Sequence, residues 1–146
     1  MTEFKGRHIL VTGASTGIGR ATARMLARRG ARVSLIARSE ATLQEAVAEI
    51  RSEGGAAAYG VADVGDKSAL LSVFDTAEGA FGPIEGLFAN AGMGGTFAPF
   101  SDYDDEMFDT VIRTNMTSVF WAMKRVLPGM VARRRGSIVI TGSLAS

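Results

Sequence analysis

Apolar residues along this chain fall into two alternating patterns, short continuous runs and longer stretches with a period of three to four residues. The continuous runs are typical of strands that are buried on both faces. They occupy residues 8–11, 31–37, 56–61, 84–89 and 137–141. The periodic stretches indicate amphipathic helices over residues 20–29, 66–81 and 102–134, with a further helix beginning after Ser39. Strands that alternate with helices predict an α/β fold, a parallel sheet with helices on both faces.

Residues that favour helix ends support this division of the chain. Ser39 and Asp66 precede the second and third helices, and both residue types are good N-terminal caps. Gly30 and the pair Gly82-Pro83 follow the first and third helices and favour their termination. The first helix is expected to bury one apolar face against the sheet. That face comprises Ile18, Ala21, Met25 and Leu26.

The longest predicted helix carries an apolar stripe that one amide interrupts. The stripe comprises Phe108, Val111, Ile112, Val119, Ala122, Met123, Val126 and Met130. Asn115 falls within it, and an amide on a buried face costs free energy unless it is hydrogen-bonded. Asn115 is therefore predicted to be either a structural hydrogen-bonding residue or part of a site. Pro128 is expected to bend or break the last part of this helix.

Right-handed crossovers between the predicted strands give the strand order 3-2-1-4-5, the order of a Rossmann-type doubly wound sheet. In such sheets, ligands bind beyond the carboxyl ends of the strands, near the point where the strand order reverses. The turn after the first strand, Asn90 after the fourth and Ser143 after the fifth are all expected at this edge.

A glycine-rich turn follows the first strand, with the sequence Thr12-Gly13-Ala14-Ser15-Thr16-Gly17-Ile18-Gly19. Glycine permits a tight turn and the close approach of a diphosphate, and the N-terminus of the following helix attracts the anion. A nucleoside triphosphate loop would end in Gly-Lys-Ser or Gly-Lys-Thr, whereas Arg20 follows Gly19 here. The position between a strand and a helix favours a dinucleotide site over a merely tight turn.

The spacing G-x-x-x-G-x-G resembles that of the short-chain dehydrogenase/reductase family, whose fingerprint is T-G-x-x-x-G-x-G. The resemblance continues in the family's motif order through Asp63-Val64 and Asn90-Ala91-Gly92, and it covers residues 6–146. It implies a classical-type NAD(P)-binding Rossmann domain. With Arg38, which is discussed next, the expected cofactor-binding residues are Gly13, Ser15, Thr16, Gly17, Ile18, Gly19, Arg38, Asp63, Val64, Asn90, Ala91 and Gly92.

The end of the second strand determines which dinucleotide is preferred. An acidic residue there would bind the adenosine ribose hydroxyls of NAD. This chain has Ala37 followed by Arg38, which removes the carboxylate and supplies a guanidinium suited to the 2′-phosphate of NADP. An exposed arginine at a helix start is the plainer alternative. Because Arg38 lies about twenty residues beyond the fingerprint, we predict NADP, with NAD as the less favoured cofactor.

The family resemblance also implies two catalytic residues in this chain. Asn115 matches an asparagine that holds a water molecule in a proton relay, and Ser143 matches a serine that stabilises charge on the substrate oxygen. Ser143 has the alternative role of a turn residue, as does Asp63. A hydrolase triad is unsupported, since His8 is the only histidine and begins the first strand. No metal site is expected.

One part of the family's catalytic machinery is missing from the sequence. The family's proton donor is a tyrosine with a lysine four residues later, which lowers the pKa of the phenol. The only tyrosines are Tyr59 and Tyr103, and four residues after them stand Asp63 and Met107. We therefore expect residues 1–146 to be an incomplete domain, truncated after the fifth strand and lacking the catalytic helix and the substrate region.

Composition and charge limit the classes of partner that are expected for this chain. At 146 residues, with 47% apolar and 21% charged residues, it has the size and balance of one globular domain. A net charge of +1 gives no reason to expect nucleic-acid binding, and Arg133-Arg134-Arg135 are expected to complement a helix C-terminus. There is no cysteine, and neither a leader-like N-terminus nor an apolar run of membrane-spanning length is present. A cytoplasmic protein is expected.

The sequence therefore predicts the cofactor-binding part of an NADP-dependent oxidoreductase. The complete enzyme would transfer a hydride between nicotinamide and a carbonyl or alcohol carbon of a small molecule, and it is expected to be a homo-oligomer. The chain alone is expected to be inactive because it lacks the tyrosine and the lysine. A non-catalytic dinucleotide-binding or scaffold module is the alternative.

Overall fold

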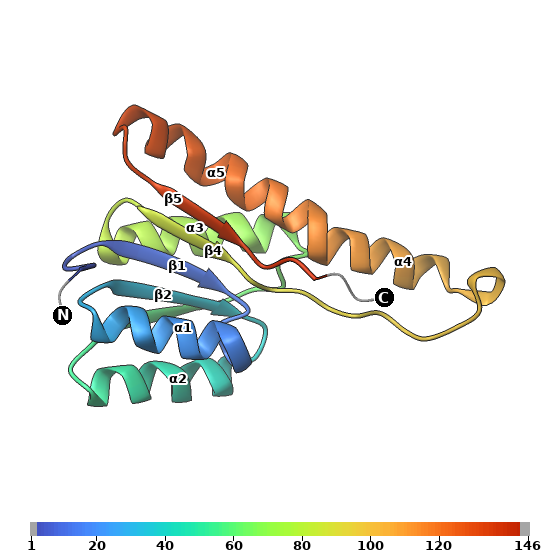
Figure 1. Cartoon of the computed structure of the whole chain (residues 1–146), viewed down its shortest axis with the longest axis horizontal. Helices are drawn as coiled ribbons and strands as arrows, with labels where there is room; N and C mark the ends of the chain where they lie inside the picture. The colour runs from blue at the N-terminus through green and yellow to red at the C-terminus, as the bar shows by residue number, and fades with distance from the viewer. Residues whose placement is uncertain (1–2, 144–146) are drawn as a thin grey trace.

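A computed structural model describes residues 3–143 and confirms the predicted doubly wound sheet. Five strands lie in the order β3-β2-β1-β4-β5, and every neighbouring pair is parallel (Figure 1). The strands are β1 His8–Thr12, β2 Arg32–Ala37, β3 Ala56–Val61, β4 Gly86–Ala89 and β5 Ser137–Ile140. The strand order reverses at β1, so the carboxyl ends of β1 and β4 flank the expected ligand position.

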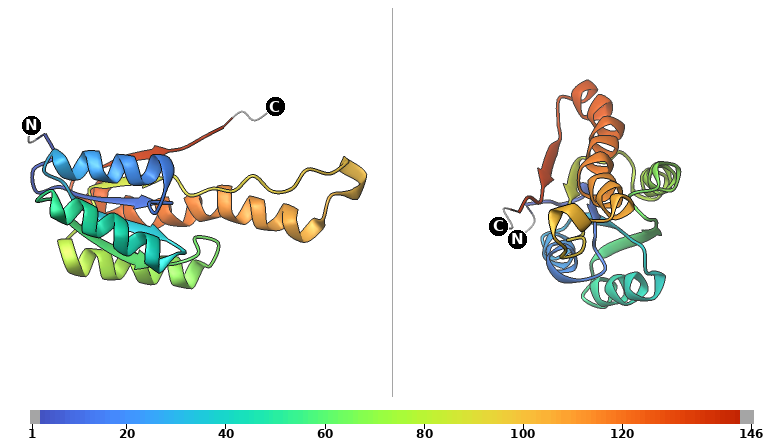
Figure 2. Two further views of the ribbon diagram at one scale, coloured as in Figure 1. Left: turned by 90° about the horizontal axis from the view of Figure 1, so that it is seen from below. Right: turned by 90° about the vertical axis from the view of Figure 1, so that its right-hand side faces the viewer.

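Helices cover both faces of the sheet and enclose two cores (Figure 2). On one face, α1 Gly17–Arg28 and α2 Glu40–Ser52 pack on Ile9 and Val11 of β1. On the other face, α3 Lys67–Phe81 and α5 Ser118–Ala132 pack on Leu10. Successive residues of β1 thus face opposite cores, which explains why its sequence is a continuous apolar run.

The buried face of α1 differs from the prediction. Ile18 and Met25 are 66% and 45% exposed, and Ala21 is exposed as well. The fully buried residues are instead Gly19, Ala23 and Ala27, while Leu26 is partly buried and packs against the core as predicted. A Cβ on Gly19 would collide with the Gly13 carbonyl oxygen, so the start of the helix packs against the glycine turn only with a residue that has no side chain.

The two predicted N-terminal caps have different outcomes. The Asp66 carboxylate accepts a hydrogen bond from the Ala69 backbone N–H at 3.0 Å, which confirms it as the cap of α3. Ser39 occupies the N-cap position of α2, but its side chain makes no capping hydrogen bond, so that part of the prediction was wrong.

The predicted helix over residues 102–134 is a continuous rod with three parts. These parts are α4 (Asp105–Ile112), a π-helical turn η2 (Arg113–Thr117) and α5. A separate 3₁₀ turn, η1 (Phe100–Asp102), precedes the rod. Pro128 lies inside α5, which continues to Ala132, so the proline does not break the helix.

The α4 end of this rod projects beyond the sheet as an arm (Figures 1 and 2). The predicted apolar stripe is therefore fully buried only at Ala122, Val126 and Met130 of α5. Phe108 of α4 is 56% exposed, and Asn115 is also exposed instead of lying on a buried face. The periodicity of the stripe was predicted correctly, but no sheet lies beneath its first half.

Candidate functional site

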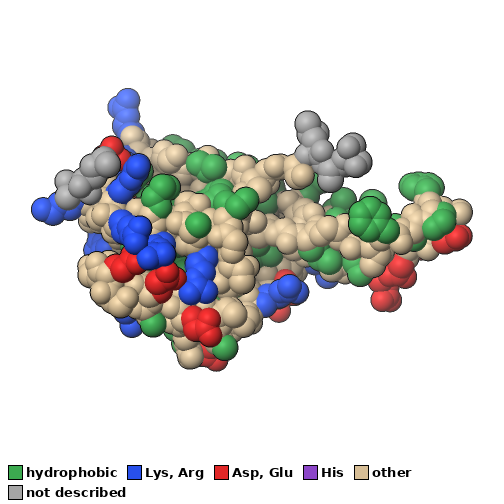
Figure 3. Space-filling model, turned by 60° about the horizontal axis from the view of Figure 1, so that its bottom comes forward, with side chains coloured by type: hydrophobic (Ala, Val, Ile, Leu, Met, Phe, Trp, Pro, Cys, Tyr) green, Lys and Arg blue, Asp and Glu red, His purple; other side chains and the backbone are tan. Residues whose placement is uncertain are grey.

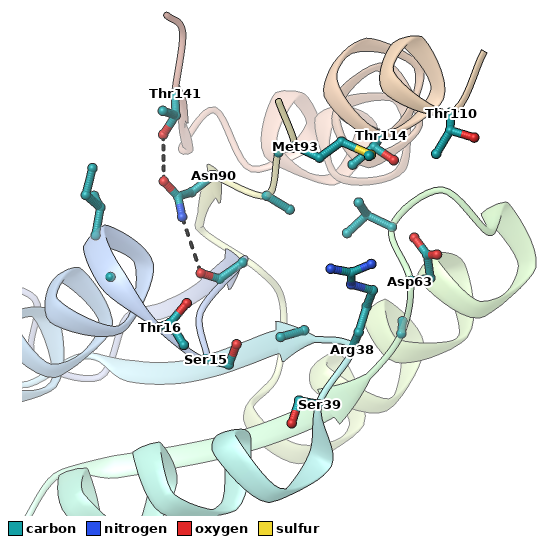
Figure 4. Close-up of a pocket in the computed structure, with 18 residues that line it drawn as sticks. Ser15, Thr16, Arg38, Ser39, Asp63, Asn90, Met93, Thr110, Thr114 and Thr141 are labelled. Atoms are coloured by element: carbon teal, nitrogen blue, oxygen red, sulfur yellow. Dashed lines mark hydrogen bonds between the residues drawn. The ribbon is translucent and has the colours of Figure 1, made fainter. Parts of the chain in front are cut away.

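A cleft of about 860 Å³ opens at the carboxyl ends of the strands (Figure 4). It is lined by the glycine turn, the end of β2, the turn after β3 and the segment after β4. All predicted cofactor-binding residues except Gly19 line this cleft. The structure therefore brings together segments that are far apart in the sequence, at the edge where such sheets bind ligands.

The glycine turn is shaped by two close backbone approaches. Gly13 has a φ of +63°, and a Cβ there would lie 2.9 Å from the Ala91 Cα. A Cβ on Gly19 would lie 2.2 Å from the Gly13 carbonyl oxygen, so Gly19 supports the turn from beneath the cleft. The N-cap of α1, Thr16, makes no side-chain cap bond, and no acidic residue stands in the first turn. The N–H groups and positive dipole end of α1 are thus available to an anion.

Asn90 connects the ends of three strands. Its backbone N–H and that of Ala91 both donate to the Thr12 Oγ1 at the end of β1, at 3.0 and 3.1 Å. Its side-chain Nδ2 donates to the Gly13 carbonyl at 3.3 Å, and its Oδ1 accepts from the Thr141 hydroxyl at 2.8 Å (Figure 4). These bonds fix the glycine turn relative to β4 and β5 and so set the floor of the cleft.

Two charged side chains, Arg38 and Asp63, stand among the described residues that line the cleft. The Arg38 guanidinium is directed into the cleft in Figure 4, and it forms no hydrogen bond or ion pair with any described residue. The Asp63 Oδ1 accepts from the Gly65 backbone N–H at 2.9 Å, which is the turn-forming role considered from the sequence. Asp63 is nevertheless a cleft residue, so its carboxylate is both a turn former and accessible to a ligand.

Asn115 lies in the π-helical turn and clamps the segment after β4. Its Oδ1 accepts from the Met93 backbone N–H, and its Nδ2 donates to the Met93 carbonyl, both at 2.8 Å. π-helical turns occur often at functional sites. The sequence left Asn115 as either a structural hydrogen-bonding residue or part of a site, and its two bonds to Met93 show the structural role. Neither Asn115 nor Ser143 lines the cleft, and Ser143 is exposed beyond the end of β5.

Comparison with known proteins identifies the family. Residues 7–146 match the family described as short chain dehydrogenase. The chain belongs to the short-chain dehydrogenase family. The inactive 2-(S)-hydroxypropyl-CoM dehydrogenase 2 of Xanthobacter autotrophicus is 44% identical over 124 residues, which are 84% of this chain and 52% of that protein. The chain spans about half the length of the curated relatives it matches.

Solved structures that resemble this chain contain both nicotinamide cofactors. An NAD⁺-bound xylitol dehydrogenase matches this chain with a TM-score of 0.92 and 38% sequence identity. The match covers 98% of this chain and 55% of the xylitol dehydrogenase chain. A metagenomic short-chain oxidoreductase in complex with NADP matches with a TM-score of 0.93 and 34% sequence identity, and the match covers 97% of this chain and 64% of that one. The fold is thus an NAD(P)-binding fold, and the likeness does not distinguish the two cofactors.

Several residues that line the cleft were not predicted from the sequence. They are Ala37, Ser39, Ala62, Met93, Thr110, Thr114 and Thr141. Thr110 and Thr114 are four residues apart on one helix, a spacing that places two hydroxyls on one face and was a usable signal. Met93 carried no such signal. Among the described residues, no helix combines the length and apolar character needed to cross a bilayer.

Proposed function

We propose that this chain is the NADP-binding part of an oxidoreductase that transfers a hydride between nicotinamide and a carbonyl or alcohol carbon of a small molecule. The observation that carries the proposal is Arg38, a guanidinium without a described partner in the cleft, next to Ala37 where an NAD site has an acidic residue. We also propose that the protein acts as a homo-oligomer.

Each part of the cleft suits one part of the dinucleotide. The glycine turn and the N-terminus of α1 offer N–H groups to the diphosphate. Arg38 would offer a fork of N–H donors to the 2′-phosphate, and Asp63 and Val64, which also line the cleft, would hold the adenine. Asn90, Ala91 and Gly92 would then line the cofactor where it passes β4. The bound cofactor supplies the hydride, while the protein supplies binding, orientation and charge stabilisation.

The proposed catalytic residues are Asn115, which would anchor a water molecule, and Ser143, which would stabilise a developing oxyanion. Neither is a proton donor tuned to neutral pH. Tyr59 is hydrogen-bonded to Glu40 at 3.1 Å, and neither it nor Tyr103 has a lysine four residues later. We therefore propose that this chain alone does not reduce carbonyls, because loss of proton transfer typically removes a factor of about 10²–10⁴ in rate.

Activity is tested by following NADPH absorbance with a panel of aldehydes, ketones and quinones. Turnover by a preparation whose intact mass matches residues 1–146 would show that another acid exists in these residues. The alternative function, a non-catalytic dinucleotide-binding module, has one supporting observation, since the Xanthobacter relative is itself named inactive. A longer native polypeptide that continues into Y-x-x-x-K would exclude that alternative.

Cofactor choice is tested by titrating NADP and NAD against the wild type and Arg38→Ala. Removal of a charge-assisted contact typically costs about 1.5–3 kcal/mol, so NADP affinity is expected to fall roughly ten- to hundred-fold while NAD affinity changes little. Lys5→Ala, an exposed residue that precedes β1, is the control because it removes the same charge away from the cleft. Equal NADP affinity in wild type and Arg38→Ala would overturn the assignment.

A further inference from the structure

A buried hydroxyl stands at the point where the π-helical turn meets α5. Ser118 is the first residue of α5 and is 4% exposed, on the face of the helix that packs on the sheet. The other buried residues of this face are Ala122, Val126 and Met130, which are all apolar. A hydroxyl on such a face costs free energy unless it is hydrogen-bonded, whereas an alanine would pack there without this cost. Packing alone therefore does not explain a serine at this position.

Ser118 uses both of its donors to hold the π-helical turn. Its backbone N–H donates to the Arg113 carbonyl, five residues back, as a π turn requires. In an α-helix this N–H would donate to the Thr114 carbonyl, four residues back. The Ser118 hydroxyl donates to that Thr114 carbonyl instead, at 2.5 Å. The hydroxyl thus replaces the bond that the backbone gives up when the helix takes in one additional residue.

Other hydroxyls in the chain make a similar bond in a different setting. The Thr76 hydroxyl donates to the Ser72 carbonyl at 3.1 Å, within α3. The Thr110 hydroxyl donates to the Glu106 carbonyl at 2.8 Å, within α4. Both threonines are exposed, and in a regular α-helix the backbone supplies a donor to the same carbonyl. At Ser118 the hydroxyl is buried and takes the place of the backbone donor.

The rotation of α4 about the axis of the rod depends on this turn. Among the described residues of α4, none is buried, and Figure 3 shows the arm projecting from the body with apolar and acidic side chains around its end. By contrast, α5 is fixed by its buried face. The orientation of α4 is therefore transmitted from α5 through Arg113–Thr117 and is not set by a core of its own.

Conversion of the π turn to an α-helix would advance every residue of α4 by one position. Asn115 would then lie where Thr114 lies, and Met116 would lie where Asn115 lies. A thioether cannot replace the amide that bonds both backbone groups of Met93. Thr110 and Thr114 would also leave their places on the wall of the cleft (Figure 4). The register of this turn thus determines which side chains face the cleft and the segment after β4.

We propose that Ser118 is a positioning residue for the dinucleotide cleft. Its hydroxyl stabilises the π turn over the α-helical register, and the turn directs Thr114 to the cleft wall and Asn115 to Met93. Ser118 is not among the described residues that line the cleft, so it acts through these neighbours. Its effect on cofactor binding rests on the proposed function, whereas the state of the turn can be measured without any cofactor.

The first test compares side chains of matched shape at this position. In Ser118→Ala, hydrogen exchange at the Met93 amide is expected to accelerate about tenfold, while the Leu10 amide in β1 keeps its protection. Ser118→Thr keeps the hydroxyl and should retain slow exchange at Met93, whereas Ser118→Val has the same shape without the hydroxyl and should lose it. Thr76→Ala removes an ordinary bond of this kind and is the control. Wild-type exchange at Met93 in Ser118→Ala and Ser118→Val would overturn the proposal.

The second test removes the π turn and with it the need for the hydroxyl. Deletion of Met116, which is 62% exposed, places Ser118 four residues after Arg113, so the backbone bond between them becomes α-helical. Because α4 then keeps its rotation, the bonds to Met93 should persist, and Ser118→Ala should have little effect in this background. An effect as large as in the undeleted chain would show that the hydroxyl does not act through the turn, against the proposal.

Cofactor titration separates this inference from the proposed function. Ser118→Ala is expected to bind NADP about three- to tenfold more weakly than the wild type, and Ser118→Thr about as tightly. If exchange at Met93 responds as expected but the wild type binds neither NADP nor NAD, the turn is as inferred and the proposed function is wrong. Equal NADP affinity in wild type and Ser118→Ala, with accelerated exchange at Met93, would overturn the positioning role of Ser118.

Discussion

The sheet body and the α4 arm contain the same kind of apolar periodicity and bury it to opposite extents. In the body, Phe74 of α3 is fully buried, as the period of its helix predicts. In the arm, Phe108 continues an equally regular pattern and remains exposed. Periodicity thus identifies a face that needs a neighbour, but it does not say whether that neighbour lies in the same chain.

The largest expected effect comes from truncating one phenylalanine in each of the two regions. Phe74→Ala is expected to lower the free energy of unfolding by about 3–5 kcal/mol, because it leaves a cavity in the core. Phe97→Ala, at the exposed arm tip, is expected to change it by less than about 0.5 kcal/mol. Urea denaturation of the two variants and the wild type measures both changes. Similar losses in the two variants would contradict the contrast.

A second comparison, between two glycines, is expected to give a smaller loss of stability. Gly19→Ala is expected to cost about 1–3 kcal/mol and to weaken dinucleotide binding, because its Cβ would collide with the Gly13 carbonyl and the Asn90 side chain. Gly94→Ala, in the segment after β4, meets no atom within 4 Å and is the matched control. Thermal unfolding and NADP titration of both variants check this. An unaffected Gly19→Ala would show that the turn is looser than described.

Asn115 links the body to the arm, and its removal tests that link. Asn115→Ala deletes both hydrogen bonds to Met93, and an effect of about 1–2 kcal/mol on local opening is expected from two exposed bonds. Hydrogen exchange at the Met93 amide should therefore accelerate about five- to thirty-fold while the β1 amides keep their protection. Thr110→Ala, on the same rod, is the control. Unchanged exchange at Met93 would disprove the clamp.

The smallest effect concerns His8, at the opposite edge of the sheet from the cleft. Burial lowers the pKa of this imidazole below its usual 6.5, and the nearby Arg32 adds to this, while the Gly82 carbonyl, Glu78 and Glu85 oppose it. The unfolded chain therefore binds more protons just below pH 6.5, and the free energy of unfolding is expected to fall as the pH drops through that window.

The single histidine makes this dependence easy to measure. NMR titration of the imidazole gives its folded pKa directly, and a value at or above 6.5 would be inconsistent with the burial argument. His8→Gln cannot titrate, so its free energy of unfolding should vary less between pH 7 and pH 5.5 than that of the wild type. The comparison uses the change with pH and does not depend on the absolute stability of the variant.

The sequence predicted the body better than the arm for physical reasons. Strand order and the position of the cleft follow from right-handed crossovers and from the glycine turn, and both are local or nearly local rules. The inner face of α1 was predicted correctly only at Leu26, because the small residues Ala23 and Ala27 are buried in place of the larger Ile18 and Met25. The Asn115 contact with Met93 joins segments 22 residues apart, and no local pattern specifies such a contact.

The arm shows a different limit of sequence analysis. The predicted length of the helix over residues 102–134 was largely correct. The point along this helix beyond which no strand packs against it depends on where β4 and β5 end. The π turn at Arg113–Thr117 also has no signal in the apolar period, since it shifts the register by one residue without interrupting the helix.

The proposed selection of a 2′-phosphate by Arg38 is tested with adenosine 2′,5′-bisphosphate. This molecule differs from adenosine 5′-monophosphate only by that phosphate, and both are expected to bind in the half of the cleft that the glycine turn, Arg38 and Asp63 line. Calorimetric titration of wild type is expected to show binding of the bisphosphate tighter by about tenfold or more, with this advantage lost in Arg38→Ala. Equal affinity for the two nucleotides in wild type, or an advantage that persists in Arg38→Ala, would contradict this role of Arg38.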